Sequence, residues 1–207
     1  MNYFITGIGT NVGKTIVSAI LTESLQADYW KPIQSGTNEG KDSDTIRDLI
    51  SNSKTIIHPE SYLLKQPLSP HFAAKLEQVE IELNKINVPA TSNNLIIEGA
   101  GGIFVPINDT QFVIDIAKKI ECEIILVVSN YLGCINHTLL SLNYLISNHF
   151  KVKAIVFNDT FETEVKSVII NHYKELQIID IPILENLSKE SVKKISELVY
   201  KSFIKAL

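Results

Sequence analysis

The sequence predicts an α/β protein with a mostly parallel central sheet and helices on both faces. Short apolar runs alternate with longer segments of helical period, which is the pattern of a parallel sheet buried between helices. Hydrophobic residues make up 45% of the 207 residues and charged residues 20%, the balance of an ordinary globular protein. This length suits a single domain, residues 1–207, with one buried core.

The expected elements follow from the period of the apolar residues. Short runs rich in β-branched and aromatic residues predict strands at Asn2–Thr6, Asp28–Lys31, Ser61–Leu64, Leu95–Glu98, Ile124–Ser129, Val152–Asn158 and Ile178–Pro182. Helical periods predict helices at Lys14–Gln26, Ser43–Ile50, Phe72–Leu76, Gln111–Ile120, Asn136–Asn148, Glu164–Leu176 and Ser188–Ile204. The stretch Ile33–Asn94 mixes turn pairs with short elements, and its pattern fixes no order for them.

A glycine-rich turn lies between the first strand and the first helix, in the run Gly7-Ile8-Gly9-Thr10-Asn11-Val12-Gly13-Lys14-Thr15. Phosphate oxygens need several N–H donors at once, and such a turn supplies them. Lys14 is expected to reach the β- and γ-phosphates and the Thr15 hydroxyl to bind Mg²⁺. The strict GxxxxGK[ST] pattern would begin at Ile8, so this loop is a G-x₅-G-K-T variant. The fold prediction is therefore P-loop NTPase-like, and an ordinary glycine-rich turn with a chance lysine is the alternative.

Glu98 is the first candidate for an acidic magnesium ligand, because Mg²⁺ prefers oxygen donors. It ends a buried strand and is expected at the same sheet edge as the P-loop. Gly99, Ala100 and Gly101 follow, and glycines let the backbone approach phosphates closely. The alternative is a strand-end carboxylate that binds nothing.

Asp44 and Lys31 are weaker candidates when each is taken alone. Asp44 matches an acid at a helix N-terminus, where the helix dipole favours it. Lys31 ends the second strand beside a turn and would point toward the nucleotide edge, but it also fits a solvated surface lysine.

Composition excludes several classes of protein. The net charge of -4 and the lack of a Lys/Arg-rich run argue against a nucleic-acid partner. Cys122 and Cys134 form no CxxC pair, disulfide framework or zinc site. The apolar stretches are far shorter than the roughly 20 residues that span a bilayer. The chain opens on a strand-like run without a leader pattern, so we expect a cytoplasmic protein without a membrane partner.

A series of blocks along nearly the whole chain resembles the dethiobiotin synthetase family. The blocks are, in order, TGIGTNVGKT, WKPIQSG, SDT, LSPH, IIEGAGG, LGCINH, FNDT and IPIL. The resemblance implies a magnesium-dependent ligase that uses ATP, CO₂ and 7,8-diaminononanoate in the penultimate step of biotin synthesis. In that reaction a substrate amine captures CO₂ as a carbamate, whose oxygen attacks the γ-phosphate. The neighbouring amine then closes the carbamic–phosphoric anhydride into the cyclic urea.

The same resemblance implies roles for individual residues. ATP would be bound by Asn11, Val12, Gly13, Lys14, Thr15, Ile16, Asp44, Glu98, Gly99, Ala100 and Gly101. The metal ligands would be Thr15, Asp44 and Glu98. Adenine would lie against Asn158, Asp159, Pro182, Ile183 and Leu184. Lys31 and Lys14 would be the catalytic residues, with Lys31 as an electrostatic stabiliser between substrate and γ-phosphate rather than a nucleophile. Thr10 and Ser35 would contact the substrate.

The block Gly133-Cys134-Ile135-Asn136 precedes a long apolar helix, whose free N–H groups suit a carboxylate. The resemblance places the tail of the substrate here, across a homodimer interface. A plain helix start with Asn136 as N-cap is compatible with that role. We interpret Cys134 as a packing residue, and His137 and His71 as structural residues.

Two positions depart from the family pattern. Asn11 stands where relatives can carry an acidic residue. Tyr173 does not have the spacing of a tyrosine that holds the substrate carboxylate in some relatives, and that role is not transferred to it.

The principal alternative is a ParA/MinD-like switch ATPase that acts through partner or membrane binding. Such proteins carry a signature lysine in the pattern KGGxGK[ST], and Gly9 occupies that position here. The last helix alternates lysines with apolar residues, as membrane-surface helices do, but Glu190 and Glu197 favour a helix packed on the sheet. Relatives that activate carboxylates for amidation, as in cobyrinate amidation, usually carry a glutaminase domain, for which this length leaves no room.

Overall fold

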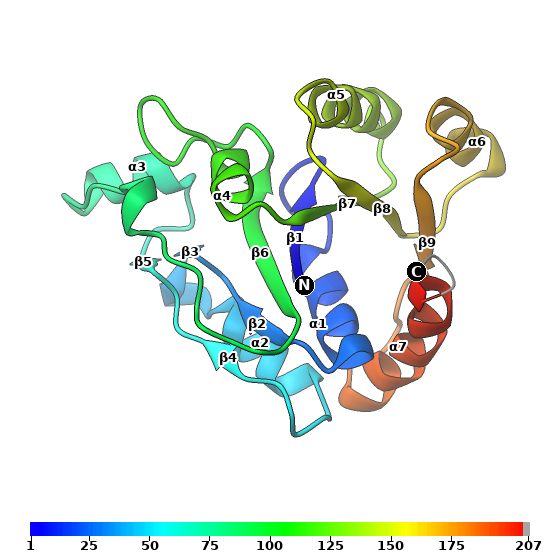
Figure 1. The fold of residues 1–207 in the computed structure, drawn as a ribbon, viewed down its shortest axis with the longest axis horizontal. Helices are drawn as coiled ribbons and strands as arrows, with labels where there is room; N and C mark the ends of the chain where they lie inside the picture. Colours follow the sequence, from blue (N-terminus) through cyan, green and yellow to red (C-terminus); the bar gives the residue numbers. More distant parts are fainter. Residues whose placement is uncertain (205–207) are drawn as a thin grey trace.

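A seven-stranded parallel sheet forms the centre of the computed structural model, which describes residues 1–204 (Figure 1). Across the sheet the strands are β4 (Ile57–His58), β2 (Asp28–Trp30), β6 (Leu95–Gly102), β1 (Asn2–Gly7), β7 (Glu123–Val128), β8 (Val152–Asn158) and β9 (Gln177–Ile181). All of the pairings between these strands are parallel. The predicted mostly parallel sheet is therefore confirmed.

The inner strands explain why the sheet is parallel and buried. β1 and β7 are near-continuous runs of large apolar residues, and Phe4, Ile5, Ile125 and Val127 have no exposed surface. Strands that are covered on both faces have such continuous apolar sequences, because the side chains on each face of the strand pack into a hydrophobic core. The P-loop and Glu98 meet because β1 pairs with β6, with Ile5 opposite Glu98.

Helices cover both faces of the sheet, as the sequence predicts. They are α1 (Lys14–Leu25), α2 (Asp42–Leu49), α3 (Pro70–Leu76), α4 (Val113–Ile120), α5 (Cys134–Ser147), α6 (Thr163–His172) and α7 (Lys189–Ile204). Figure 1 shows α1 and α7 on one face, where they contact each other, and α4, α5 and α6 on the other.

The last helix packs on the sheet rather than presenting an apolar face to solvent. Val192, Val199 and Phe203 of α7 are buried, and the Phe203 ring meets Tyr3 of β1 edge-on with 5.3 Å between centroids. This confirms the packed-helix interpretation. Within residues 1–204, no helix combines the length and apolar character that crossing a membrane requires.

The stretch between β2 and β6 holds the elements that the sequence did not resolve. β3 (Ile33–Ser35) and β5 (Tyr62–Leu64) form a separate two-stranded parallel sheet. Two 3₁₀ turns, η1 (Thr37–Glu39) and η2 (Leu83–Lys85), lie in the same stretch. The predicted strand at Ser61–Leu64 corresponds to β5, but β3 and β4 were not predicted, because each ends inside a turn pair, Ser35-Gly36 or His58-Pro59.

Three helix starts differ from prediction by two residues, and the first is that of α3, which begins at Pro70 rather than Phe72. The helix expected from Gln111 begins at Val113, because Phe112 is extended and its N–H donates to the Asp115 carboxylate at 2.8 Å. The interpretation of Asn136 as an N-cap is wrong: α5 begins at Cys134, and Gly133 caps it with φ +106°. A left-handed φ of this size favours glycine, and this explains why the helix starts two residues earlier.

Candidate active site

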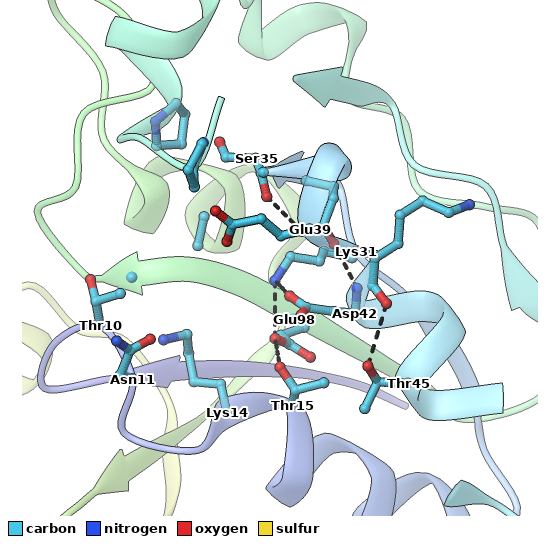
Figure 2. Close-up of a pocket in the computed structure, with 18 of the residues that line it drawn as sticks. Thr10, Asn11, Lys14, Thr15, Lys31, Ser35, Glu39, Asp42, Thr45 and Glu98 are labelled. Carbon is cyan, nitrogen blue, oxygen red and sulfur yellow. Dashed lines mark hydrogen bonds and ion pairs between the residues drawn. The ribbon is translucent and has the colours of Figure 1, made fainter. Parts of the chain in front are cut away.

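A cavity of about 1060 Å³ opens at the carboxyl edge of the sheet, where ligands bind in open α/β folds (Figure 2). Its walls come from the P-loop, the segment after β2, the start of α2 and the end of β6. Most of the predicted phosphate, metal and substrate residues line it, namely Thr10, Asn11, Gly13, Lys14, Thr15, Ile16, Lys31, Ser35, Asp44, Glu98, Ala100 and Gly101.

The P-loop is a tight turn in which glycine is required at two positions. A Cβ on Gly7 would lie 2.5 Å from a Val12 methyl group. Gly13 has φ +87°, and a Cβ there would lie 2.0 Å from the side-chain nitrogen of Asn158. The loop runs directly into α1 at Lys14, so the N–H groups of the first turn have no partners within the helix. This geometry fits an anionic phosphate group.

Lys14 is folded along this loop and is almost fully buried, with 7% of its surface exposed. Its Nζ donates to the carbonyl oxygen of Gly9 at 3.2 Å. Burial lowers the pKa of Lys14 to about 8, an effect that the charge of Glu98 opposes and that of Lys31 reinforces. A polyanion beside this side chain would favour its ammonium form.

Glu98 is the centre of the polar cluster and is only 1% exposed. Its Oε1 accepts hydrogen bonds from the Thr15 hydroxyl at 2.9 Å and from Lys31 Nζ at 3.0 Å. Its Oε2 accepts a hydrogen bond from the Tyr29 hydroxyl at 2.8 Å. The strand predicted to end at Glu98 continues as β6 to Gly102, so this carboxylate lies within the strand and is tied to the P-loop helix and to β2 at once.

Lys31 lies between two carboxylates, as Figure 2 shows, and is 5% exposed. It pairs with Glu98 and with Asp42, the first residue of α2. Burial by itself would lower the pKa of Lys31, but the charges of Glu98 and Asp42 outweigh it and raise the pKa. Lys31 is thus a buried ammonium group held by two carboxylates, and the surface-lysine interpretation is wrong.

The predicted magnesium ligands are only partly brought together. The Thr15 hydroxyl and Glu98 carboxylate lie in contact and supply hard oxygen donors, which fit Mg²⁺. Asp44 lines the same cavity, but its carboxylate pairs with Arg47 at 2.5 Å and Lys41 at 3.9 Å. In the part of the chain that the structure describes, no group of three His, Cys, Asp or Glu side chains forms a metal cage. The cavity therefore fits a metal that takes its remaining ligands from bound phosphate or water.

The predicted substrate residues of the loops also face the cavity. The Ser35 hydroxyl oxygen is buried and has no hydrogen-bond partner among the described residues. An orphaned polar atom in a cavity wall marks a place where a ligand can bind, because such groups are otherwise satisfied. The Thr10 hydroxyl lies 3.4 Å from the Cβ position of Gly101, so the P-loop and the end of β6 are adjacent there.

The remaining predicted nucleotide residues lie at the same sheet edge but do not line this cavity. Asn158 ends β8 and donates from Nδ2 to the Val12 carbonyl at 3.0 Å, so it braces the P-loop. The Asp159 carboxylate accepts the N–H of Thr160 at 2.6 Å. Ile181 of β9 pairs with Asn158, so the segment Pro182-Ile183-Leu184 starts beside the end of β8. Gly99 packs against the ring of Phe4: a Cβ added to Gly99 would lie 3.1 Å from the nearest ring carbon.

The start of α5 also lies outside the cavity but near the P-loop. The Tyr131 hydroxyl would lie 3.8 Å from a Cβ added to Gly9, and it is 2.7 Å from Nδ1 of His137. Gly133, Ile135 and Asn136 are at least partly exposed, whereas Cys134 is 3% exposed. This burial agrees with the interpretation of Cys134 as a packing residue.

Sequence reasoning missed two residues of this site, Asp42 and Tyr29, and a third, Tyr131, that lies beside the P-loop outside the cavity. Asp42 precedes the predicted Asp44 by two residues, and only the acidic character of the first turn of α2 indicated it. Tyr29 reads as an ordinary strand aromatic, and Tyr131 as a loop residue. Their contacts depend on strand register and loop position, which the sequence does not state.

Comparisons with known proteins find relatives along nearly the whole chain. A family model described as an AAA domain matches residues 1–191. A protein of Cytophaga hutchinsonii named ATP-dependent dethiobiotin synthetase is 51% identical over 191 residues, which cover 92% of each chain. Proteins with the same name from Christiangramia forsetii and Lawsonia intracellularis are 39% and 43% identical, over 95% and 94% of this chain and 99% and 94% of their own.

Solved structures with a similar shape show the fold alone. A plasmid partition protein of Borrelia burgdorferi bound to AMPPNP has a TM-score of 0.60 and 13% identity, covering 100% of this chain and 98% of its own. A ParA family ATPase of Chlorobium tepidum has a TM-score of 0.54 and 13% identity, covering 99% and 97%. They confirm the P-loop NTPase-like fold.

Proposed function

Because this chain belongs to the ATP-dependent dethiobiotin synthetase family, we propose that it closes the ureido ring of dethiobiotin in the cavity around Lys31 and Glu98. The substrates are 7,8-diaminononanoate, CO₂ and ATP, and the products are dethiobiotin, ADP and phosphate. The observation that carries the proposal is the buried Lys31–Glu98 pair beside the P-loop residues Lys14 and Thr15.

The cationic residues of the cavity bind the phosphates and stabilise the charge that develops during the reaction. Lys14 and the first turn of α1 hold the phosphates of ATP. Lys31 remains an ammonium ion and stabilises the negative charge where the carbamate oxygen meets the γ-phosphorus. The carbamate itself attacks, so Lys31 forms no covalent bond.

The metal site consists of the Thr15 hydroxyl, Glu98 and Asp44. Bound Mg²⁺ would neutralise phosphate charge as the γ-phosphoryl group is transferred. Glu98 is fixed by three donors, which limits its rotation. Asp44, on α2, would leave its partners Arg47 and Lys41 to reach the metal.

Neighbouring loops complete the substrate and nucleotide sites. Ser35 offers a free hydroxyl to the diamine, and Thr10 lines the same cavity beside Gly101. Asn158 and Asp159, with residues 182–184, hold the adenine end of ATP. The register of β8 and β9, which places these segments side by side, supports this assignment.

We also propose a homodimer in which the start of α5 contributes to the partner's substrate site. An apolar surface supports it: Leu132 is 104% exposed, Leu140 61% and Phe104 49%, and the Phe104 ring packs on Tyr144 of α5. Exposed apolar patches of this kind mark interaction surfaces. Sedimentation of Leu140→Glu tests this, with Leu198→Glu of α7, which is 56% exposed, as the control. Dissociation of only the first variant would support the dimer, and a wild-type monomer would contradict it.

Residues 1–207 are proposed to work as one cytoplasmic domain without a nucleic-acid or membrane partner. The seven-stranded sheet takes strands from both halves of the described chain, and the net charge of -4 disfavours binding to the phosphates of nucleic acid.

The activity assay separates this function from that of a switch ATPase. Phosphate release is followed with diaminononanoate, bicarbonate, Mg²⁺ and ATP, and each component is omitted in turn. Release that requires both diamine and bicarbonate supports the ligase. Phosphate release that does not depend on the diamine but increases with lipid vesicles would support the switch ATPase. Only the similarity of fold favours that alternative.

A further inference from the structure

Tyr29 contacts the central carboxylate of the site without lining the cavity. It lies in β2 with no exposed surface, and its hydroxyl donates to Oε2 of Glu98 at 2.8 Å. β2 and β6 are parallel neighbours, and Tyr29 is paired with Ile96. Ile96 and Glu98 are two residues apart, so they share one face of the sheet, the face on which Tyr29 also lies.

The two oxygens of Glu98 have different partners because of this contact. Oε1 accepts from Thr15 and Lys31, the groups of the reaction site, whereas Oε2 accepts from Tyr29. A glutamate carboxylate has a soft terminal torsion and could otherwise turn or exchange its oxygens. Burial, together with the charge of Glu98, raises the pKa of Tyr29 well above its ordinary value, so the phenol remains a donor.

We propose that Tyr29 is a positioning residue for the metal site. Its hydroxyl holds Oε2 of Glu98 and so keeps Oε1 directed at Thr15 and Lys31. The inference rests on the proposed function, because it takes Glu98 as a ligand of Mg²⁺. Tyr29 would thus support metal binding through Glu98, without itself contacting the substrate or the nucleotide.

A purely structural role is the competing explanation, because a buried phenol needs a hydrogen-bond partner wherever it lies. Tyr3 provides a matched control. It lies in β1, is 3% exposed, and its hydroxyl contacts Met1 sulfur at 3.3 Å. Phenylalanine at either position keeps the ring and removes one hydrogen-bonded hydroxyl. Only the change at Tyr29 removes a bond to Glu98.

The test is calorimetric titration of Tyr29→Phe, Tyr3→Phe and the wild type with ADP, first in EDTA and then with saturating Mg²⁺. The measured quantity is the metal enhancement, the ratio of the two ADP Kd values. We expect it to be about tenfold smaller in Tyr29→Phe, as for loss of one hydrogen bond to a charged group. The Kd in EDTA should not change, and Tyr3→Phe should match the wild type.

A further pair shows whether Tyr29 acts through Glu98. The double variant Glu98→Gln with Tyr29→Phe should show the same metal enhancement as Glu98→Gln alone. An undiminished enhancement in Tyr29→Phe, or an equal loss in Tyr3→Phe, would overturn the proposal. Partial unfolding would lower the binding stoichiometry and leave Kd interpretable. Because the readout is ADP binding, it is independent of whether dethiobiotin is formed.

Discussion

The Lys31 ammonium group, just after β2, and the Glu98 carboxylate, within the neighbouring parallel strand β6, lie 3.0 Å apart, and both are buried. Removing two charges from water is costly unless they are paired and hydrogen-bonded. Here Tyr29, Thr15 and Asp42 complete the set of partners. The arrangement fixes a cation beside the P-loop before any ligand arrives, which is the pre-organisation that phosphoryl transfer requires.

Replacing Lys31 with alanine should lower both activity and stability. Loss of the cation at the reacting oxygens predicts a fall in kcat of at least about a hundredfold. Leaving Glu98 buried beside an empty partner position should cost about 3 kcal/mol of unfolding free energy. Thermal unfolding would then shift by about 2–4 °C for each kcal/mol. Lys85→Ala, which breaks the exposed pair with Glu82, should change neither quantity, and equal effects from the two variants would contradict the account.

Gly13→Ala should damage nucleotide binding through a specific overlap. Gly13 and Gly40 both have positive φ, so alanine at either adds backbone strain of about 1–3 kcal/mol. Only at Gly13 does the new Cβ meet a neighbour, the Asn158 side chain at 2.0 Å, whereas Gly40 has open space. ADP calorimetry should therefore show weaker binding for Gly13→Ala than for Gly40→Ala. Indistinguishable Kd values would mean that Asn158 does not brace the loop.

The lowered pKa of Lys14 predicts that ADP binding depends on pH. Bound phosphates favour the ammonium form, so above about pH 8 binding must take up a proton. Affinity should then fall by up to about tenfold per pH unit. Calorimetry in buffers of different ionisation enthalpy would count the proton. Lys14→Arg, which does not titrate in this range, should lose this dependence, and its retention would assign the titration to another group.

The Lys14 amine should affect protein stability in the opposite sense: rising pH weakens ADP binding but increases the contribution of Lys14 to stability. The folded-state pKa of about 8 lies below the ordinary 10.5, so the unfolded chain binds more protons between these values. The contribution of Lys14 to the stability of the ligand-free protein therefore rises with pH across that window. Comparing unfolding of wild type and Lys14→Met as a function of pH isolates this contribution, and a wild-type advantage that shrinks with rising pH would contradict it.

Asp44 and Asp42 should affect different steps. If Asp44 is the metal ligand, Asp44→Asn should raise the Mg²⁺ concentration for half-maximal activity at least about tenfold. Asp42 pairs with Lys31 instead, so Asp42→Asn should lower kcat and leave the Mg²⁺ requirement unchanged. Activity measured against Mg²⁺ at saturating ATP decides between them. The reverse pattern would make Asp42 the ligand.

The parts of the fold that the sequence predicts are those encoded locally. Buried apolar runs such as Ile124–Val128 identify inner parallel strands, and the glycines before Lys14 place the P-loop. β3 and β4 escape prediction because they are short and each ends inside a pair of residues that is typical of a turn. Asn136 was assigned as a cap from its residue type, but the positive φ of Gly133 decides where α5 starts.

Contacts between distant residues are the parts of the site that the sequence could not supply. Tyr29 and Glu98 are 69 residues apart, and they meet only through the register of β2 and β6. Lys31 looked like a surface residue because its burial depends on α2 and β6 closing over it. The type and order of the motifs thus indicated the chemistry, while the partners of each charge required the structure.

Incorporation of ¹³C from bicarbonate into the product tests the central claim most directly. The protein is incubated with ATP, Mg²⁺, diaminononanoate and ¹³C-bicarbonate, and dethiobiotin is measured by mass spectrometry alongside phosphate. The account predicts one labelled carbon in each dethiobiotin, one phosphate for each product molecule, and neither with Lys31→Ala. Phosphate released at the same rate without the diamine, with no labelled product, would contradict it.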